Sequence, residues 1–95
     1  MCELRQTKPP VADRQAVEAA AEALRGKRTG VTYRDLARAL KGCDARHVSS
    51  HGSHRTWKHD SLRDHLTIID KGSGDVHTVY ISKTRKFLLA IAGAI

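Results

Sequence analysis

The chain has 95 residues, which is enough for one small domain and too short for several. Apolar residues make up 40% of it but aromatic residues only 4%, so a buried core must consist mainly of Ala, Val, Leu and Ile. Lys and Arg number 17 against 10 Asp and Glu, a net charge of +7 with neutral histidines, which favours a polyanionic partner (nucleic acid or an acidic protein surface) over a merely basic protein.

Residues 1–10 end in two prolines and are predicted to form a flexible arm, followed by a single domain over residues 11–95. The arm contains no apolar segment typical of a secretory signal. Cys2 and Cys43 are too few and too far apart for a disulfide framework. The apolar run at 87–95 is much shorter than the roughly 20 residues that span a bilayer, so no membrane partner is expected. These features predict a cytoplasmic protein.

Two helices are predicted before the first strand. Apolar residues at helical spacing indicate an amphipathic helix within 11–25: Val17, Ala20, Ala21 and Leu24. A second helix is predicted to begin at Thr32, because Asp35 three residues later completes a capping box. Gly42 is placed to end this helix.

The spacing of apolar residues then changes to two, which predicts strands at 45–50, 54–59 and 65–70. The segment 76–81 is either a fourth, edge strand or an extended approach to a last helix capped by Ser82. One side of that helix carries Thr84, Leu88, Ile91 and Ile95. The expected fold is therefore α+β, with the helices packed on one face of the sheet.

All histidines except His77 lie between positions 47 and 65, and one interpretation of this cluster is a metal site. His47, His51 and His54 have spacings that can chelate. Strands and turns do not bring residues four apart together as a helix does, and no cysteine or acidic pair completes a ligand set. No metal or other cofactor is expected.

Proton transfer without a metal fits the histidine-rich stretch better. Histidine can donate or accept a proton near neutral pH, because its unperturbed pKa is about 6.5. RNA carries its own nucleophile, the ribose 2′-hydroxyl, so a ribonuclease needs only a base for that hydroxyl, an acid for the leaving 5′-oxygen and cations for the phosphate charge. The alternative interpretation is that these histidines are only polar residues of a hairpin.

Alternation along the second strand divides its residues between two faces. One face is predicted to carry His54, Thr56 and Lys58. The other face is predicted to carry Arg55, Trp57 and His59. Trp57 is expected to anchor the core, whereas Arg55 and His59 are expected to reach solvent at the strand ends.

The residues Gly52-Ser53-His54, followed by Arg55-Thr56-Trp57-Lys58-His59, resemble the signature of HicA toxins, in which GSH is followed by one variable residue and then by a hydrophobic, an aromatic and a basic residue and a histidine. The helix end DLARALKG, the strand HLTIID and Tyr80 before a basic last helix agree with this. The resemblance covers roughly Thr32 to Ala92. The sequence departs from the family at Gly42-Cys43, where Gly-Phe is common, and at 59–63, which lacks the family's proline and glycine.

HicA toxins are small mRNA interferases with a fold like double-stranded-RNA-binding domains (dsRBD-like). The resemblance thus implies that fold, with an extra N-terminal helix as in the family's longer variants, and endoribonuclease cleavage of mRNA without the ribosome. It implies that His54 is the catalytic histidine and that Gly52 supports its conformation. The implied partner is a HicB antitoxin, which covers the active site.

Other residues are candidates for supporting roles. Arg55 and Lys58 are candidates for binding the phosphate, His51 or His59 for the second proton transfer, and Ser53 for support at the turn. Three cations near the start of the last helix suit RNA or the antitoxin: Lys83, Arg85 and Lys86. A non-catalytic RNA-binding module would use the same basic surface and remains an alternative, as does a winged-helix DNA binder.

Overall fold

A computed structural model describes residues 13–95, and the predicted arm at 1–10 lies outside this range. The described elements are, in chain order, α1 (Arg14–Leu24), α2 (Tyr33–Gly42), β1 (Arg46–His51), β2 (His54–Lys58), β3 (Leu66–Ile69) and α3 (Thr78–Ala94). The strands form an antiparallel sheet in the order β1-β2-β3. The predicted α+β class and the three strands are confirmed.

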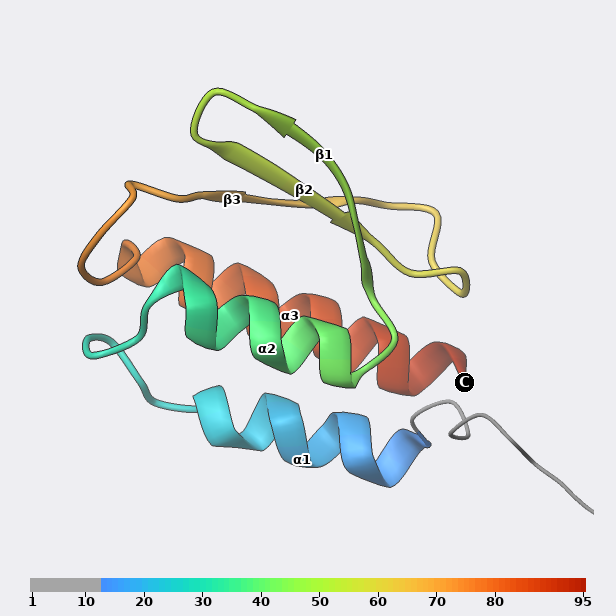
Figure 1. Ribbon diagram of the computed structural model, residues 1–95. Helices are drawn as coiled ribbons and strands as arrows, with labels where there is room; N and C mark the ends of the chain where they lie inside the picture. Colours follow the sequence, from blue (N-terminus) through green and yellow to red (C-terminus); the bar gives the residue numbers. More distant parts are fainter. Residues whose placement is uncertain (1–12) are drawn as a thin grey trace, which may run out of the picture.

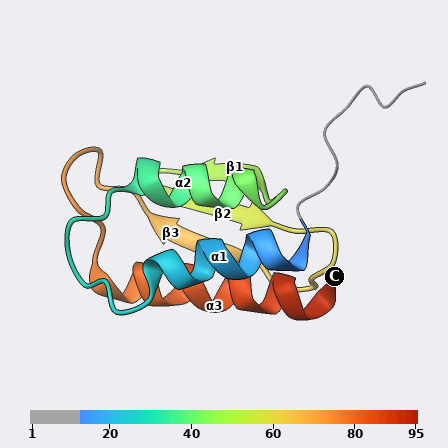
Figure 2. The same cartoon turned by 90° about the horizontal axis from the view of Figure 1, so that it is seen from below.

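The elements are stacked in layers (Figure 1). α2 and α3 lie under one face of the sheet, and α1 lies on the far side of these two helices, alongside α3 (Figures 1 and 2). The other face of the sheet is not covered by any described element. The predicted packing of helices on one sheet face is therefore confirmed for α2 and α3, while α1 contributes a further layer.

The start of α2 follows directly from its sequence. Thr32 Oγ1 accepts a hydrogen bond from the Asp35 N–H (3.2 Å), and Asp35 Oδ2 accepts one from the Thr32 N–H (3.0 Å), so the predicted capping box is present. The hydrogen bond from the Thr32 backbone is the main cause that lowers the pKa of Asp35. The helix ends at Gly42 as predicted, and the left-handed residue that turns the chain away is Asp44, with φ of 66°.

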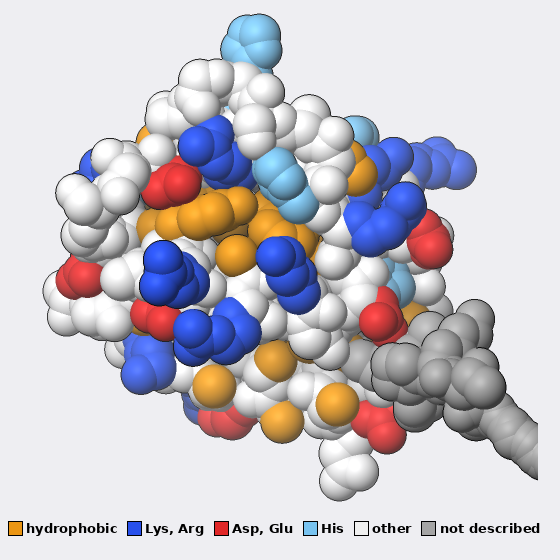
Figure 3. All heavy atoms as spheres, viewed as in Figure 1, with side chains coloured by type: hydrophobic (Ala, Val, Ile, Leu, Met, Phe, Trp, Pro, Cys, Tyr) orange, Lys and Arg blue, Asp and Glu red, His pale blue; other side chains and the backbone are white. Residues whose placement is uncertain are grey.

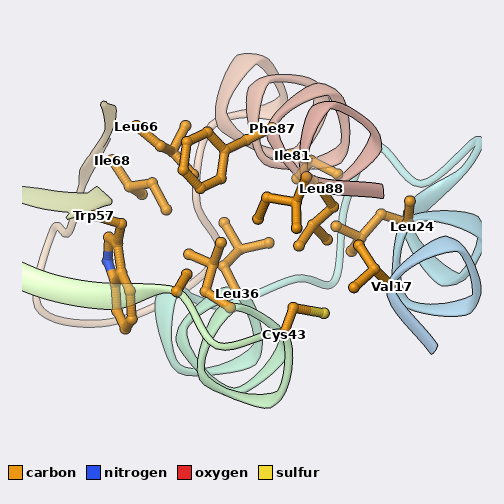
Figure 4. Packing of buried hydrophobic residues seen from close by; sticks show 14 of the residues in the cluster. Val17, Leu24, Leu36, Cys43, Trp57, Leu66, Ile68, Ile81, Phe87 and Leu88 are labelled. Atoms are coloured by element: carbon orange, nitrogen blue, oxygen red, sulfur yellow. The ribbon is translucent and has the colours of Figure 1, made fainter. Parts of the chain in front are cut away.

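The core lies between the sheet and the helices and continues between α3 and α1 (Figure 4). Trp57 is 1% exposed and is the largest buried side chain, which confirms it as the core anchor. Val17, Ala21 and Leu24 of α1 are buried as their spacing predicts. Burial also raises the pKa of the Cys43 thiol at the end of α2, because the charged thiolate is poorly solvated there.

The prediction of a fourth strand or a long extended approach at 76–81 is wrong. α3 already begins at Thr78, so Ser82 lies inside the helix and is not its cap. The cap is His77, whose Nδ1 accepts a hydrogen bond from the Val79 N–H (3.1 Å). Alternation along 76–81 suggested a strand, but helical spacing is what places Ile81 on the buried side of α3 with the core residues that follow it.

The helical side predicted to carry Thr84, Leu88, Ile91 and Ile95 is only partly as expected. Thr84, Leu88 and Ile91 are fully buried, whereas Ile95 follows the end of α3 and is 39% exposed. Within residues 13–95, two buried polar atoms have no hydrogen-bond partner, namely Thr84 Oγ1 and Arg85 Nε.

A short clip joins the chain before α2 to the chain before α3. Its members are residues 30–32 and 75–76. The Val76 N–H donates to the Val31 carbonyl (2.8 Å), the Gly30 N–H donates to Asp75 Oδ2 (2.8 Å), and Thr32 and Asp75 form an isolated β-bridge. The clip therefore brings together the two ends of the segment that contains α2 and the whole sheet.

Candidate functional site

The histidine-rich stretch folds into the hairpin of β1 and β2, as predicted. Its last cross-strand pair is His51 with His54, which leaves Gly52 and Ser53 as the two residues of the turn. Gly52 has φ of 61°, and φ of Ser53 is not positive. This combination is that of a type II′ turn, which requires a left-handed first residue and therefore favours glycine. Gly52 thus fixes the pairing of the two histidines.

His54 and His51 lie together on the open face of the sheet, which we call the outer face. Trp57 is buried toward the helices, so alternation places His54 and Thr56 on the opposite side of β2. His51 is directly opposite His54 in the register, and both are exposed. Directly opposed residues have Cβ atoms about 5 Å apart, so the two imidazoles are neighbours at the surface.

Arg55 follows His54 in sequence but lies on the other side of β2, the inner face. Its Nη1 donates to the Gly52 carbonyl (2.6 Å), and its Nε is 3.6 Å from Asp70 Oδ2. The Asp70 N–H in turn donates to the Ser53 carbonyl (2.8 Å). Both turn residues therefore accept a hydrogen bond through their carbonyl groups. Arg55 stabilises the turn and does not lie beside the His54 ring.

Sequence reasoning missed Asp70 because its role depends on the pairing of β2 with β3. The register joins His54 to Ile69 and Arg55 to Ile68, which brings the end of β3 to the turn. The one available signal was an acidic residue at the end of a predicted strand, and this signal does not specify a partner.

A second set of inner-face contacts surrounds Trp57. Its indole Nε1–H donates to the Tyr33 hydroxyl (3.2 Å), and its ring lies 5.4 Å from the ring of His47, centroid to centroid. His47 Nε2 is 3.0 Å from Ser50 Oγ. Desolvation is the largest effect on Tyr33 and raises the pKa of its hydroxyl. These contacts link the hairpin to the first turn of α2. They also place His47 on the inner face, away from the outer-face pair.

The structure does not bring Lys58 near His54. Both lie on the outer face, but three residues of β2 lie between them, so they are roughly 13 Å apart along the strand. Lys58 is instead opposite Arg46, whose Nη2 forms an ion pair with Asp60 Oδ1 (2.6 Å). Lys58 therefore belongs to the other end of the hairpin.

The prediction that His59 reaches solvent is wrong. β2 ends at Lys58, and the chain then turns so that His59 is only 8% exposed. His59 Nδ1 accepts a hydrogen bond from the Ser61 N–H (3.0 Å) and thereby closes the turn after β2. Alternation could not foresee this, because it holds only as long as the strand continues.

The cations of α3 lie at the β3 edge of the sheet, not beside the histidine pair. Lys83 and Lys86 line a groove of about 530 Å³ between α3 and the segment around β3, together with Arg63 and His65. Arg85 is half-buried. On the side of the molecule shown in Figure 3, Lys and Arg side chains also gather over α2, where Arg34, Arg38 and Lys41 are exposed.

In the part of the chain from residue 13 onward, no three His, Cys, Asp or Glu side chains gather as a metal ion requires. Within the same residues, no helix combines the length and apolar character needed to cross a bilayer.

No protein-family model matches the chain, and searches of curated proteins and of solved structures likewise gave no match. Any inference about function therefore has to begin from the residues of the molecule itself, above all the outer-face histidine pair.

Proposed function

We propose that this protein is a metal-independent endoribonuclease that cleaves mRNA and acts as the toxin of a type II toxin–antitoxin pair of the HicA type. A HicB-like antitoxin would then neutralise it in the cytoplasm. Three strands with two helices on one face support the dsRBD-like part of this proposal. The observation that carries the catalytic part is the exposed His51–His54 pair.

Two neighbouring imidazoles supply the two proton transfers that cleavage of RNA needs. A neutral imidazole takes the proton of the 2′-hydroxyl while the 2′-oxygen forms a bond to phosphorus, and a protonated imidazole gives its proton to the 5′-oxygen as the bond from that oxygen to phosphorus breaks. The products are a 2′,3′-cyclic phosphate and a 5′-hydroxyl. His54 takes one of these roles and His51 the other.

The turn next to the pair has room for the phosphodiester. Gly52 has no side chain, and a Cβ built there would meet nothing within 4 Å. The hydrogen bonds from Arg55 and Asp70 to the turn carbonyl groups hold the backbone in place. A rigid turn reduces the cost of holding the two imidazoles in a productive geometry. Arg55 is thus proposed as a positioning residue, with Ser53 serving as the acceptor that ties the turn to β3.

The test is cleavage of single-stranded RNA in EDTA by the native protein and by single-histidine variants. We expect His54→Ala to lower the rate by about 10²–10⁴-fold, the range typical of a lost general acid or base. We expect His51→Ala to lower it as well. His65→Ala is the matched control, because His65 is also exposed but lies outside the hairpin, and it should leave the rate unchanged. Equal cleavage by native protein and His54→Ala would overturn the proposal.

A non-catalytic RNA-binding module is the second candidate, and one observation favours it. Arg55, the cation nearest to His54 in sequence, is occupied by Asp70 and the Gly52 carbonyl, and Lys58 is distant. Under this alternative, RNA would shift on a native gel but remain intact, and His54→Ala would bind it almost as well as the native protein does.

A further inference from the structure

A pocket of about 360 Å³ lies between the end of β3 and the start of α3. It is lined by Ile69, Lys71, His77, Val79 and Tyr80. Its size is near the lower end of the roughly 300–1,000 Å³ range of small-molecule sites, which suits one flat ring system better than a larger ligand. None of these lining residues except Tyr80 was singled out by the sequence.

The pocket begins beside the histidine pair. Ile69 is directly opposite His54 in the β2–β3 register, so the two side chains point to the same side of the sheet with Cβ atoms about 5 Å apart. The hairpin turn, the end of β3 and the start of α3 all lie at one end of the molecule (Figures 1 and 2). An RNA strand bound at His54 would therefore pass Ile69 and the β3 edge of the sheet to reach the α3 side of the pocket.

The lining combines an aromatic ring, exposed apolar atoms and nearby cations. Tyr80 is half-buried, and the Lys83 Nζ lies 5.7 Å from the centroid of its ring. Val79 is 41% exposed and offers apolar surface to a ligand. Lys71 is exposed at the rim. Sites for single-stranded RNA are built in this way, with bases on aromatic and apolar surfaces and cations along the phosphates.

We propose that this pocket holds one base of a single-stranded RNA whose scissile phosphate lies at His51 and His54. This proposal rests on the proposed function, since it names how the same site would hold its substrate. In it, Tyr80 and Val79 contact the base, while Lys71 and Lys83 contact the flanking phosphates. The pocket then decides which bond along the strand is presented to the histidines.

Binding and cleavage can be separated with an RNA oligonucleotide whose 2′-hydroxyl groups are methylated, because such RNA cannot supply the nucleophile. Its affinity for the native protein is measured by fluorescence anisotropy. Tyr80→Leu keeps apolar packing but removes the ring, and should weaken binding roughly 5- to 150-fold, the contribution of stacking one base. Tyr80→Phe keeps the ring and should bind as the native protein does.

Val79 and Leu89 provide a matched pair, because both are on α3 and both are 41% exposed, but only Val79 lines the pocket. Val79→Ser should weaken binding roughly three- to tenfold through lost apolar contact, and Leu89→Ser should have no effect. Circular dichroism of each variant checks that it is folded.

The outcomes distinguish the two proposals. Binding that depends on Tyr80 and Val79, without cleavage of unmodified RNA, would support the base pocket and overturn the nuclease. Cleavage by native protein with no effect of Tyr80→Leu or Val79→Ser would keep the nuclease and overturn the pocket. Equal losses in Val79→Ser and Leu89→Ser, or no binding of RNA by the native protein, would also overturn the pocket.

Discussion

The two faces of β2 differ sharply, although their residues alternate along one short strand. The outer face carries His54 and Thr56 in contact with solvent, and the inner face carries Trp57, which is 1% exposed, and Arg55, which is bound to the turn. Residues that are adjacent in the sequence of β2 thus differ in what they contribute. The inner face stabilises the hairpin, and the outer face is free to carry residues that contribute little to stability.

The largest expected effect on stability comes from the inner face. Trp57→Ala should lower the free energy of unfolding by about 3–5 kcal/mol, because it empties the largest buried site in the core. Its neighbour Thr56→Ala removes only a side-chain contact between hydroxyls (Thr56 Oγ1 to Thr67 Oγ1, 3.3 Å) and should cost about 0.5–1.5 kcal/mol. Urea unfolding followed by circular dichroism measures both. Similar losses of unfolding free energy for the two variants would show that the two faces contribute equally to stability.

A smaller effect is expected from the polar contact inside the same face. Tyr33→Phe leaves the buried indole N–H of Trp57 without its acceptor and should cost about 1–3 kcal/mol. Tyr80→Phe is the matched control, since Tyr80 is also half-buried and its hydroxyl makes no hydrogen bond to residues 13–95. The control should unfold at the same urea concentration as the native protein. If both variants lose equally, the Trp57–Tyr33 hydrogen bond contributes nothing.

A further, modest loss of stability is expected at the turn, and it should affect the outer face most. Gly52→Ala forces a side chain into a left-handed conformation and should cost about 1–2 kcal/mol, although a Cβ there has open space. Gly42→Ala is the control: it also has open space, but it is helical and should be stabilised by about 0.5–1 kcal/mol. Under conditions in which Gly52→Ala is fully folded, its rate of RNA cleavage should still be lower than that of the native protein. Unchanged cleavage would show that the turn does not position the histidines.

Much of the fold could be predicted because its signals are local. The capping box of Thr32 and Asp35 sets the start of α2, and the spacing of Val17 and Leu24 sets the buried side of α1. The burial of Trp57 followed from simple alternation. Each of these features depends only on residues close together in the chain, so it can be predicted from the sequence without knowledge of the fold.

Several of the features that failed depend on contacts far apart in the chain. The start of α3 at Thr78 is supported by the hydrogen bond from its hydroxyl to the Arg28 carbonyl (2.8 Å), which no local pattern reveals. The role of Arg55 depends on Asp70 from the next strand. For the site, the sequence placed His54 and Lys58 on one face, but it could not tell that His51, not Lys58, is beside His54.

The clip at residues 30–32 and 75–76 has a mechanical consequence. At the opposite end of the α1–α3 pair, Arg14 Nε donates to the Ala92 carbonyl (3.1 Å) and Arg14 Nη2 to the Ile95 carbonyl (3.0 Å). A force pulling residues 13 and 95 apart would therefore peel α1 from α3 before it reaches the clip. The load would then meet the clip before it is passed to α2 and the strands. Tension at the two ends of the described chain thus acts on the α1–α3 pair and the clip before it acts on the hairpin.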